Sequence, residues 1–339
     1  PRVKRFYVGF EFDFMKRYSR LFAMIAIAVV CIGFVSCGSD DDGDEAVLET
    51  PEFSGVSAKY IVTDTRSDYK SIEFTESGNY VIVLNAYATR AAGIKEGGFS
   101  GLTICPWQKL GTRAGYANII MGKYTVRNGN TFVLDGFGTI VVDNEDGSTK
   151  SLVITEKGGS TYTLNAKVKT QYPDEQMTLN LCRTWTMESI RLKTQAEGFK
   201  FDKTEKGGNL PELMIDLYRS LLNWAAKYDD EITKEQIDEA MKEIEANVNA
   251  TVQSVEGFIF SQSGTYMVTY GDGSLAISTW TWQNIGKGIL HYSWDYADED
   301  EGLAGECKVE FDGSYCVITE EAENDDVSMT MIYKLKEVK

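Results

Sequence analysis

Short segments in which apolar and polar residues alternate recur from residue 58 to the end of the chain, separated by turns rich in Gly, Asn and Asp. This two-residue period is typical of antiparallel strands that bury one face. Asn128-Gly129 and Asp146-Gly147 are strong hairpin signals. We therefore predict eight strands in the first half, at residues 58–63, 71–75, 79–86, 122–127, 131–134, 138–143, 148–155 and 160–168.

The second half repeats this plan. Residues 72–80 and 258–266 share Phe, Ser, Gly and Tyr at matched places, and the sequence of residues 153–156 recurs at 317–320. Two matches in the same order indicate the duplication of one domain, with a boundary at residues 172–178. We predict eight further strands, at residues 184–193, 258–261, 264–270, 274–283, 289–294, 304–311, 314–321 and 329–337.

Residues 210–255 depart from the strand pattern and have helical periodicity. Pro211 suits the first turn of one helix, and Thr233 with Gln236 forms a capping box for a second. We predict an antiparallel helical hairpin inserted between the first and second strands of the second domain. Its apolar stripes either pack on each other and on the sheet, or form a lid over the barrel mouth or a docking surface for another protein.

The predicted fold is mainly β, with two tandem antiparallel eight-stranded barrels, because closure removes the exposed edges of a sheet. The first barrel covers residues 53–171, and the second covers residues 178–339 with its helical insertion. Cys182-Arg183-Thr184-Trp185, the Phe-x-x-x-Gly-x-Tyr hairpin and residues 279–282 resemble the small lipocalin-like domains of Bacteroidetes lipoproteins. This resemblance implies a binding function without catalysis.

Residues 1–36 are interpreted as upstream sequence followed by a lipoprotein signal peptide. Met15 is the expected start, because a basic cluster and the apolar run 21–35 follow it. That run is shorter than the roughly 20 apolar residues of a membrane-spanning helix, which favours a cleaved secretory signal. No comparable apolar run follows, so we predict no transmembrane helix in the mature protein.

Cys37 and the acidic residues 40–45 resemble the lipidated cysteine and tether of surface-exposed lipoproteins of Bacteroidetes. The resemblance implies lipidation of Cys37, a tether over residues 37–52, and a lipid anchor in the outer membrane with the protein facing the cell exterior. The alternative is a secreted protein cleaved near Ser36. The acidic run lacks the other ligand positions of a calcium loop, so we predict no metal there.

Composition narrows the function further. The formal net charge of −17 disfavours binding to nucleic acid and to anionic lipid surfaces. Membrane attachment is therefore expected to come from acyl chains on Cys37 alone. His291 is the single histidine, which excludes His-rich zinc or iron centres, and we predict neither a metal nor another cofactor.

Aromatic side chains are the main candidates for ligand binding. Trp280 and Trp282 share one strand face, Tyr292 and Trp294 share another, and Tyr266 lies on a neighbouring strand. Such rings either fill a small barrel as core or line a cup for a small apolar or glycan-like ligand. The predicted function is binding of such a ligand by the second barrel. The alternative is a structural or protein-interaction module with solid barrels.

Catalysis is not predicted. His291, Ser293 and Asp295 alternate along one strand and point in parallel, which is not the geometry of a catalytic triad. Glu306 and Glu310 share a strand face, but only their spacing favours a hydrolase.

Two other features remain open at the level of sequence. The loop 88–115 has a basic cluster that is a candidate anion or partner site, formed by Arg90, Lys95, Lys109 and Arg113. In the expected mature chain, four cysteines besides Cys37 permit three disulfide pairings, among which Cys307–Cys316 would need a bulge or a longer loop. The other two cysteines are Cys105 and Cys182.

Overall fold

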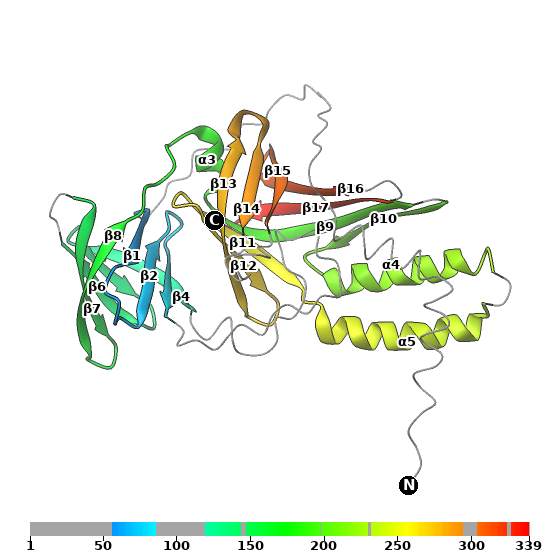
Figure 1. Cartoon of the computed structure of the whole chain (residues 1–339), viewed down its shortest axis with the longest axis horizontal. Helices are drawn as coiled ribbons and strands as arrows, with labels where there is room; N and C mark the ends of the chain where they lie inside the picture. Colours follow the sequence, from blue (N-terminus) through cyan, green and yellow to red (C-terminus); the bar gives the residue numbers. More distant parts are fainter. Residues whose placement is uncertain are drawn as a thin grey trace, which may run out of the picture.

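The computed structural model of the chain describes residues 56–85, 119–143, 147–196, 198–229, 232–293, 304–323 and 327–338. They form two closed antiparallel barrels in tandem, as predicted, with the first coloured blue to green and the second green to red in Figure 1. In the described part of the chain, no helix combines the length and apolar character needed to cross a membrane.

The first barrel closes because β8 pairs with β1, while every other strand pairs with its neighbours in chain order. Phe74 and Phe132 stack at 3.9 Å between ring centroids in its core. Its strands are β1 (Ala58–Val62), β2 (Tyr69–Phe74), β3 (Asn79–Leu84), β4 (Ile119–Arg127), β5 (Thr131–Leu134), β6 (Gly138–Val142), β7 (Thr149–Glu156) and β8 (Thr161–Val168).

The second barrel closes in the same way, through β17 (Val327–Glu337) and β9 (Thr184–Ala196). One strand was not predicted: β10 (Phe199–Lys206) pairs with the C-terminal half of β9, whose first residues pair with β11. The remaining strands are β11 (Val255–Ser261), β12 (Thr265–Tyr270), β13 (Leu275–Asn284), β14 (Ile289–Ser293), β15 (Ala304–Asp312) and β16 (Tyr315–Glu323).

A short helix that the sequence analysis missed, α3 (Gln176–Leu181), overlaps the predicted boundary between the barrels. The Trp185 Nε1–H donates to the Leu181 carbonyl at 2.9 Å, and the Trp282 Nε1–H donates to Thr178 Oγ1 at 3.0 Å. These bonds fix α3 across one end of the second barrel. The short 3-10 helix η1 (Ile285–Lys287) connects β13 to β14.

The helical insertion forms as predicted, as α4 (Leu210–Ala225) and α5 (Lys234–Thr251). Pro211 lies in the first turn of α4, and both hydrogen bonds of the Thr233–Gln236 capping box are present. The hairpin follows β10, so it lies between the first and second barrel strands. Leu213, Leu217 and Leu221 of α4 are at most 2% exposed and belong to the core of the second barrel.

The two barrels meet through the outer faces of their hairpins β2–β3 and β11–β12. Val81 and Met267 are buried there, in an apolar cluster that both barrels build. Glu73 is also buried: it pairs with Lys59 at 3.2 Å and accepts hydrogen bonds from the hydroxyls of Ser261 and Ser263. Hydrogen bonds to Glu73 and apolar burial together hold the barrels against each other.

This interface has an internal two-fold symmetry. Phe74 pairs with Tyr80 as Phe260 pairs with Tyr266, so the sequence repeat is also a structural repeat. The same registers make Lys59 equivalent to Thr184 and Asn79 equivalent to Thr265. A two-fold interface requires each contact to occur twice with the partners exchanged. That pair of contacts is Lys59 Nζ to Thr265 Oγ1 at 2.5 Å, and Asn79 Nδ2 to Thr184 Oγ1 at 3.2 Å.

Candidate ligand-binding site

The aromatic residues singled out from the sequence face the interior of the second barrel. Tyr266, Tyr292 and Trp280 are 0%, 1% and 3% exposed, and Trp282 is half-buried. Trp294 and Cys37 lie outside the described residues.

These rings pack against one another. Trp280 contacts Phe260 and Trp282 edge to face, at 6.2 and 5.5 Å between ring centroids, and its Nε1–H donates to the Ser261 carbonyl at 3.2 Å. Phe260 stacks on Tyr266 at 5.4 Å. The sequence left two interpretations of these aromatic residues: they line a cup for a ligand, or they fill the barrel as core. Their packing against one another supports the core interpretation.

A carboxylate is also buried inside the second barrel. Glu320 is 1% exposed, and it accepts hydrogen bonds from the Tyr292 hydroxyl at 2.5 Å and the Tyr333 hydroxyl at 3.0 Å. Cys307 lies opposite Glu320, since the ladder pairs Lys308 with Thr319. We call Tyr292, Cys307, Glu320 and Tyr333 the Glu320 cluster.

The repeat places an equivalent glutamate in the first barrel. Ile154 and Ile318 are matched residues of the repeated tetrapeptide, and Ile154 pairs with Tyr162 as Ile318 pairs with Tyr333. Glu156 is therefore equivalent to Glu320, and Tyr162 to Tyr333. In both barrels the tyrosine and the glutamate are diagonal neighbours on the inward face of two paired strands.

In the first barrel this glutamate reaches the solvent at one end of the barrel, where β2 and β8 begin and β7 ends. Glu156 Oε1 accepts a hydrogen bond of 2.5 Å from the Tyr69 hydroxyl. The Tyr69 ring contacts Tyr162 at 6.1 Å and Phe137 at 6.5 Å, both edge to face. Tyr162 is 41% exposed, and Glu156 and Phe137 are half-buried.

Gly138 lies directly opposite Glu156 in the ladder. The same register makes Gly138 equivalent to Cys307, so the side chain present beside Glu320 is missing beside Glu156. A side chain is excluded at Gly138, because its φ is +150° and a Cβ would lie 2.1 Å from the Thr155 carbonyl oxygen. We call Tyr69, Phe137, Gly138, Glu156 and Tyr162 the Glu156 site.

The helical insertion lies near the end of the second barrel that corresponds to the Glu156 site. The β11 strand begins at the end of its barrel that corresponds to the Glu156 site, and the Val255 N–H there donates to the Gly208 carbonyl, just before α4. In Figure 1, α4 lies along β9 and β10 where these strands continue beyond the barrel. The described part of the first barrel has no such helix.

The Tyr69 hydroxyl keeps its proton at neutral pH. Burial raises the pKa of the Tyr69 hydroxyl well above its usual value, and the hydrogen bond to Glu156 raises it further. Tyr69 thus remains a donor at physiological pH. The site combines apolar ring faces with a fixed acceptor, which suits binding of a small molecule.

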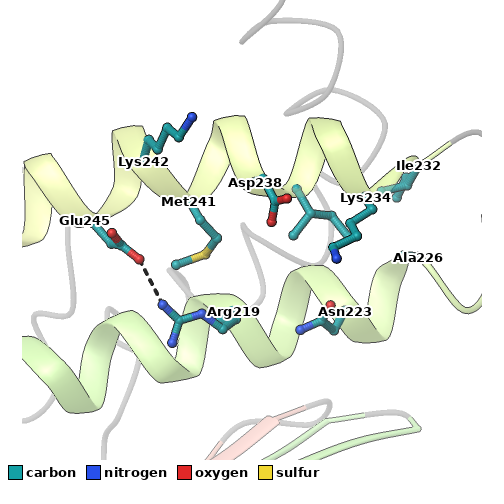
Figure 2. Close-up of a pocket in the computed structure, with 10 residues that line it drawn as sticks. Arg219, Asn223, Ala226, Ile232, Lys234, Asp238, Met241, Lys242 and Glu245 are labelled. Carbon is teal, nitrogen blue, oxygen red and sulfur yellow. Dashed lines mark hydrogen bonds and ion pairs between the residues drawn. The ribbon is translucent and has the colours of Figure 1, made fainter.

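A groove of about 650 Å³ lies between α4 and α5, and Figure 2 shows its lining. Arg219 and Glu245 bridge it with an ion pair of 2.8 Å, and Met241 lies beside them. Its other charged residues are Lys234, Asp238 and Lys242. Both signs of charge are mixed there, so the groove favours no particular class of small ligand.

The remaining candidates do not come together. His291 pairs with Thr281 and Glu306 on neighbouring strands and points outward, away from Tyr292. Glu310 pairs with Lys308 on the surface. Asp295 and the basic loop 88–115 lie outside the described residues, and no group of three potential ligands for a metal occurs within the described ranges.

The possible Cys307–Cys316 disulfide is wrong. Cys316 pairs with Phe311 of β15. Cys307 lies four residues before Phe311 on the same strand, opposite Glu320. Both thiols, and that of Cys182, are free and buried. Cys105 lies outside the described residues.

The Glu156 site was missed because the repeated tetrapeptide served only to detect duplication. Its last residue is the glutamate itself, and the following strand of each repeat contains Tyr-x-Leu, at 162–164 and 333–335. The signal in the sequence that could have revealed the site was a glutamate on the inward face of a strand, followed by a tyrosine on the next strand, in both repeats.

Comparison of the chain with protein-family models, curated proteins and solved structures finds no match.

Proposed function

We propose that this chain is a non-catalytic binding protein that takes a small ligand at the Glu156 site of its first barrel. The observation that carries the proposal is the exposure of Glu156. Both repeats have an inward glutamate beside a tyrosine, but the second is sealed by side chains whereas the first faces solvent. Eight-stranded barrels are wide enough for one small ligand near an open end.

The second barrel serves as the support in this proposal. Its interior holds Trp280, Tyr266 and Tyr292 as core, and its outer face buries the hairpin β2–β3 of the first barrel. A ligand there would have to displace side chains that are at most 3% exposed.

A structural or protein-interaction module is the second candidate. The filled second barrel and the groove between α4 and α5 favour it. In that case the helical hairpin contacts a protein partner at the cell surface, and the barrels hold no small molecule.

We further propose that the protein is attached to the outer membrane through lipid on Cys37 and faces the cell exterior. The support is the sequence: a basic and apolar leader, a cysteine and an acidic tether. Growth of an expressing bacterial host with an alkyne-tagged fatty acid should label the wild-type chain and not Cys37→Ser. Equal labelling of the two would overturn this attachment.

Native mass spectrometry tests the binding function. The full chain carrying Cys37→Ser, purified from an exporting host, should show a mass excess that is lost on denaturation. Glu156→Gln and Tyr162→Ala should lose the excess, while Glu310→Gln, an exposed control on the second barrel, should keep it. Loss of the excess only in a second-barrel variant such as Tyr292→Phe would contradict the proposed location, and an absence of any excess would favour the interaction module.

A further inference from the structure

The proposed function leaves the chemical class of ligand open, and the charge on Glu156 narrows it. One oxygen, Oε1, accepts the Tyr69 hydrogen bond, and Oε2 makes no hydrogen bond with any described residue. Within the described residues, Glu156 also forms no ion pair, although it is only half-buried. A ligand that covers this carboxylate removes its water, which is costly unless the ligand supplies a positive charge or donors.

The rings around Glu156 suit a cation. Tyr162 and Phe137 meet the Tyr69 ring at 60° and 90°, so the three rings form a corner and do not stack. Tyr162, at 41% exposed, has the most accessible ring of the three. Organic cations bind over the faces of tyrosine and phenylalanine rings, and they do so most strongly where a carboxylate lies close by.

Space and surrounding charge point the same way. Gly138 leaves the position opposite Glu156 without a side chain, where the second barrel has Cys307. Burial raises the pKa values of Tyr69 and Tyr80, and Asp68 and Asp135 raise them further, so two acids lie near this end of the barrel. Lys157 also lies there, and its backbone N–H donates to the Phe137 carbonyl at 2.7 Å. With a chain charge of −17, the field disfavours anionic ligands such as fatty acids or phosphates.

We infer that the Glu156 site binds a compact organic cation that carries a primary or quaternary ammonium group, with Glu156 as its counter-ion and Tyr162 as its ring contact. This inference rests on the proposed function. It goes beyond the proposed function by naming the charge of the ligand, since a neutral apolar molecule or a sugar would also be a small ligand of the Glu156 site.

Isothermal titration of the full Cys37→Ser chain with a pair of isosteric probes tests the charge. Choline carries a quaternary ammonium group, and 3,3-dimethylbutan-1-ol has the same shape without the charge. We expect choline to bind and its neutral isostere to bind at least about tenfold more weakly, since a desolvated cation–π contact of about 2 kcal/mol exceeds a factor of ten. Added salt should weaken the binding of choline.

Variants assign the binding to the site. Glu156→Gln keeps an acceptor for the Tyr69 hydroxyl while removing the charge, and it should weaken choline binding about tenfold or more. Tyr162→Ala should weaken it as well, whereas Tyr162→Phe retains a ring and should bind nearly as the wild type. Glu310→Gln is the matched control elsewhere on the surface, and circular dichroism checks the fold of each variant.

The outcomes separate the two proposals. Stronger binding of the neutral isostere than of choline, lost in Tyr162→Ala, would overturn the cation and leave the Glu156 site standing. Choline binding that Glu156→Gln does not change would also overturn it. If neither probe binds at millimolar concentration, the compact cation is overturned, while the mass excess in native spectrometry still decides whether the site binds any ligand.

Discussion

Gly138 and Cys307 occupy the same position in the two barrels, each directly opposite an inward-facing glutamate. In the second barrel the thiol helps to fill the space around Glu320. In the first the glycine has no side chain, the backbone of Thr155 approaches it closely, and the neighbouring Tyr162 reaches solvent. Two copies of one framework thus differ at the residue opposite the interior carboxylate.

Gly138→Ala is expected to destabilise the first barrel strongly. The new Cβ would lie 2.1 Å from the Thr155 carbonyl oxygen, and an L residue is strained at φ +150°. Gly129→Ala is the control, since its φ is +79° and its Cβ would meet nothing within 4 Å. Urea unfolding should show a loss of about 1–2 kcal/mol for the control, the cost of the left-handed conformation, and a larger loss for Gly138→Ala. Equal losses would contradict the close approach of β6 to β7.

Trp280→Ala and Tyr162→Ala should separate core from binding surface. Trp280 is 3% exposed and packed by other rings, so its truncation is expected to cost about 3–5 kcal/mol of unfolding free energy. Tyr162 is 41% exposed, and its truncation should cost roughly 1 kcal/mol or less. Denaturant titrations of both variants give the comparison. A small effect of Trp280→Ala would indicate that the second barrel is hollow.

The unfolding free energy should depend on pH through Glu76. This residue and Gln262 occupy matched positions of the two repeats, and the Gln262 backbone N–H donates a hydrogen bond to the Glu76 carboxylate at the pseudo-two-fold axis. Burial raises the pKa of the Glu76 carboxyl. The folded chain therefore binds this proton at a higher pH than the unfolded chain does. Its ionised form costs stability at neutral pH, and this cost is relieved as pH falls through the raised pKa toward the ordinary carboxyl value.

Glu76→Gln should accordingly raise the unfolding free energy at pH 7 and flatten its change between the ordinary carboxyl pKa and pH 7. Glu73→Gln is the control at the same interface. It leaves Lys59 without its partner at 3.2 Å and should destabilise the chain by about 1–3 kcal/mol at pH 7. Unfolding curves across this pH range test both, and a wild-type profile that Glu76→Gln leaves unchanged would refute the role of Glu76.

The three buried cysteines should be unreactive in the folded chain. Burial raises the pKa of the thiols of Cys182, Cys307 and Cys316, and only a thiolate reacts readily. In a chain carrying Cys31→Ser, Cys37→Ser and Cys105→Ser, Ellman's reagent should detect none of them before unfolding and all three in denaturant without reductant. Rapid reaction in the folded state, or fewer than three thiols after unfolding, would contradict the structure.

Local patterns predicted most of the fold. Alternation located all the barrel strands, and the capping box at Thr233 located α5, because these signals depend on neighbouring residues. The sequence of β10 carries a charge at five of its eight positions, so it has little apolar signal of its own and forms a strand only against β9. The helix α3 has six residues, too few for a helical period to be recognised.

The site was harder to predict because its members are brought together by closure of the barrel. Tyr69 and Glu156 are 87 residues apart, and no local pattern relates them. The aromatic stripe of Trp280 was visible in the sequence, but alternation gives only the face of a strand and leaves open whether that face is filled. The packing against Phe260 and Trp282 decided this, and it depends on two different strands, β11 and β13.

The exchanged contacts of Lys59 and Thr184 across the interface bear on the ancestry of the chain. A single ancestral barrel that presented this face to another copy of itself would have been a symmetric homodimer. Fusion of two such genes preserves the contact in one polypeptide and frees each copy to diverge. The second barrel has the insertion and a filled interior, and the first has an accessible carboxylate, so the two halves of one inherited pair now differ inside while they share the face that joins them.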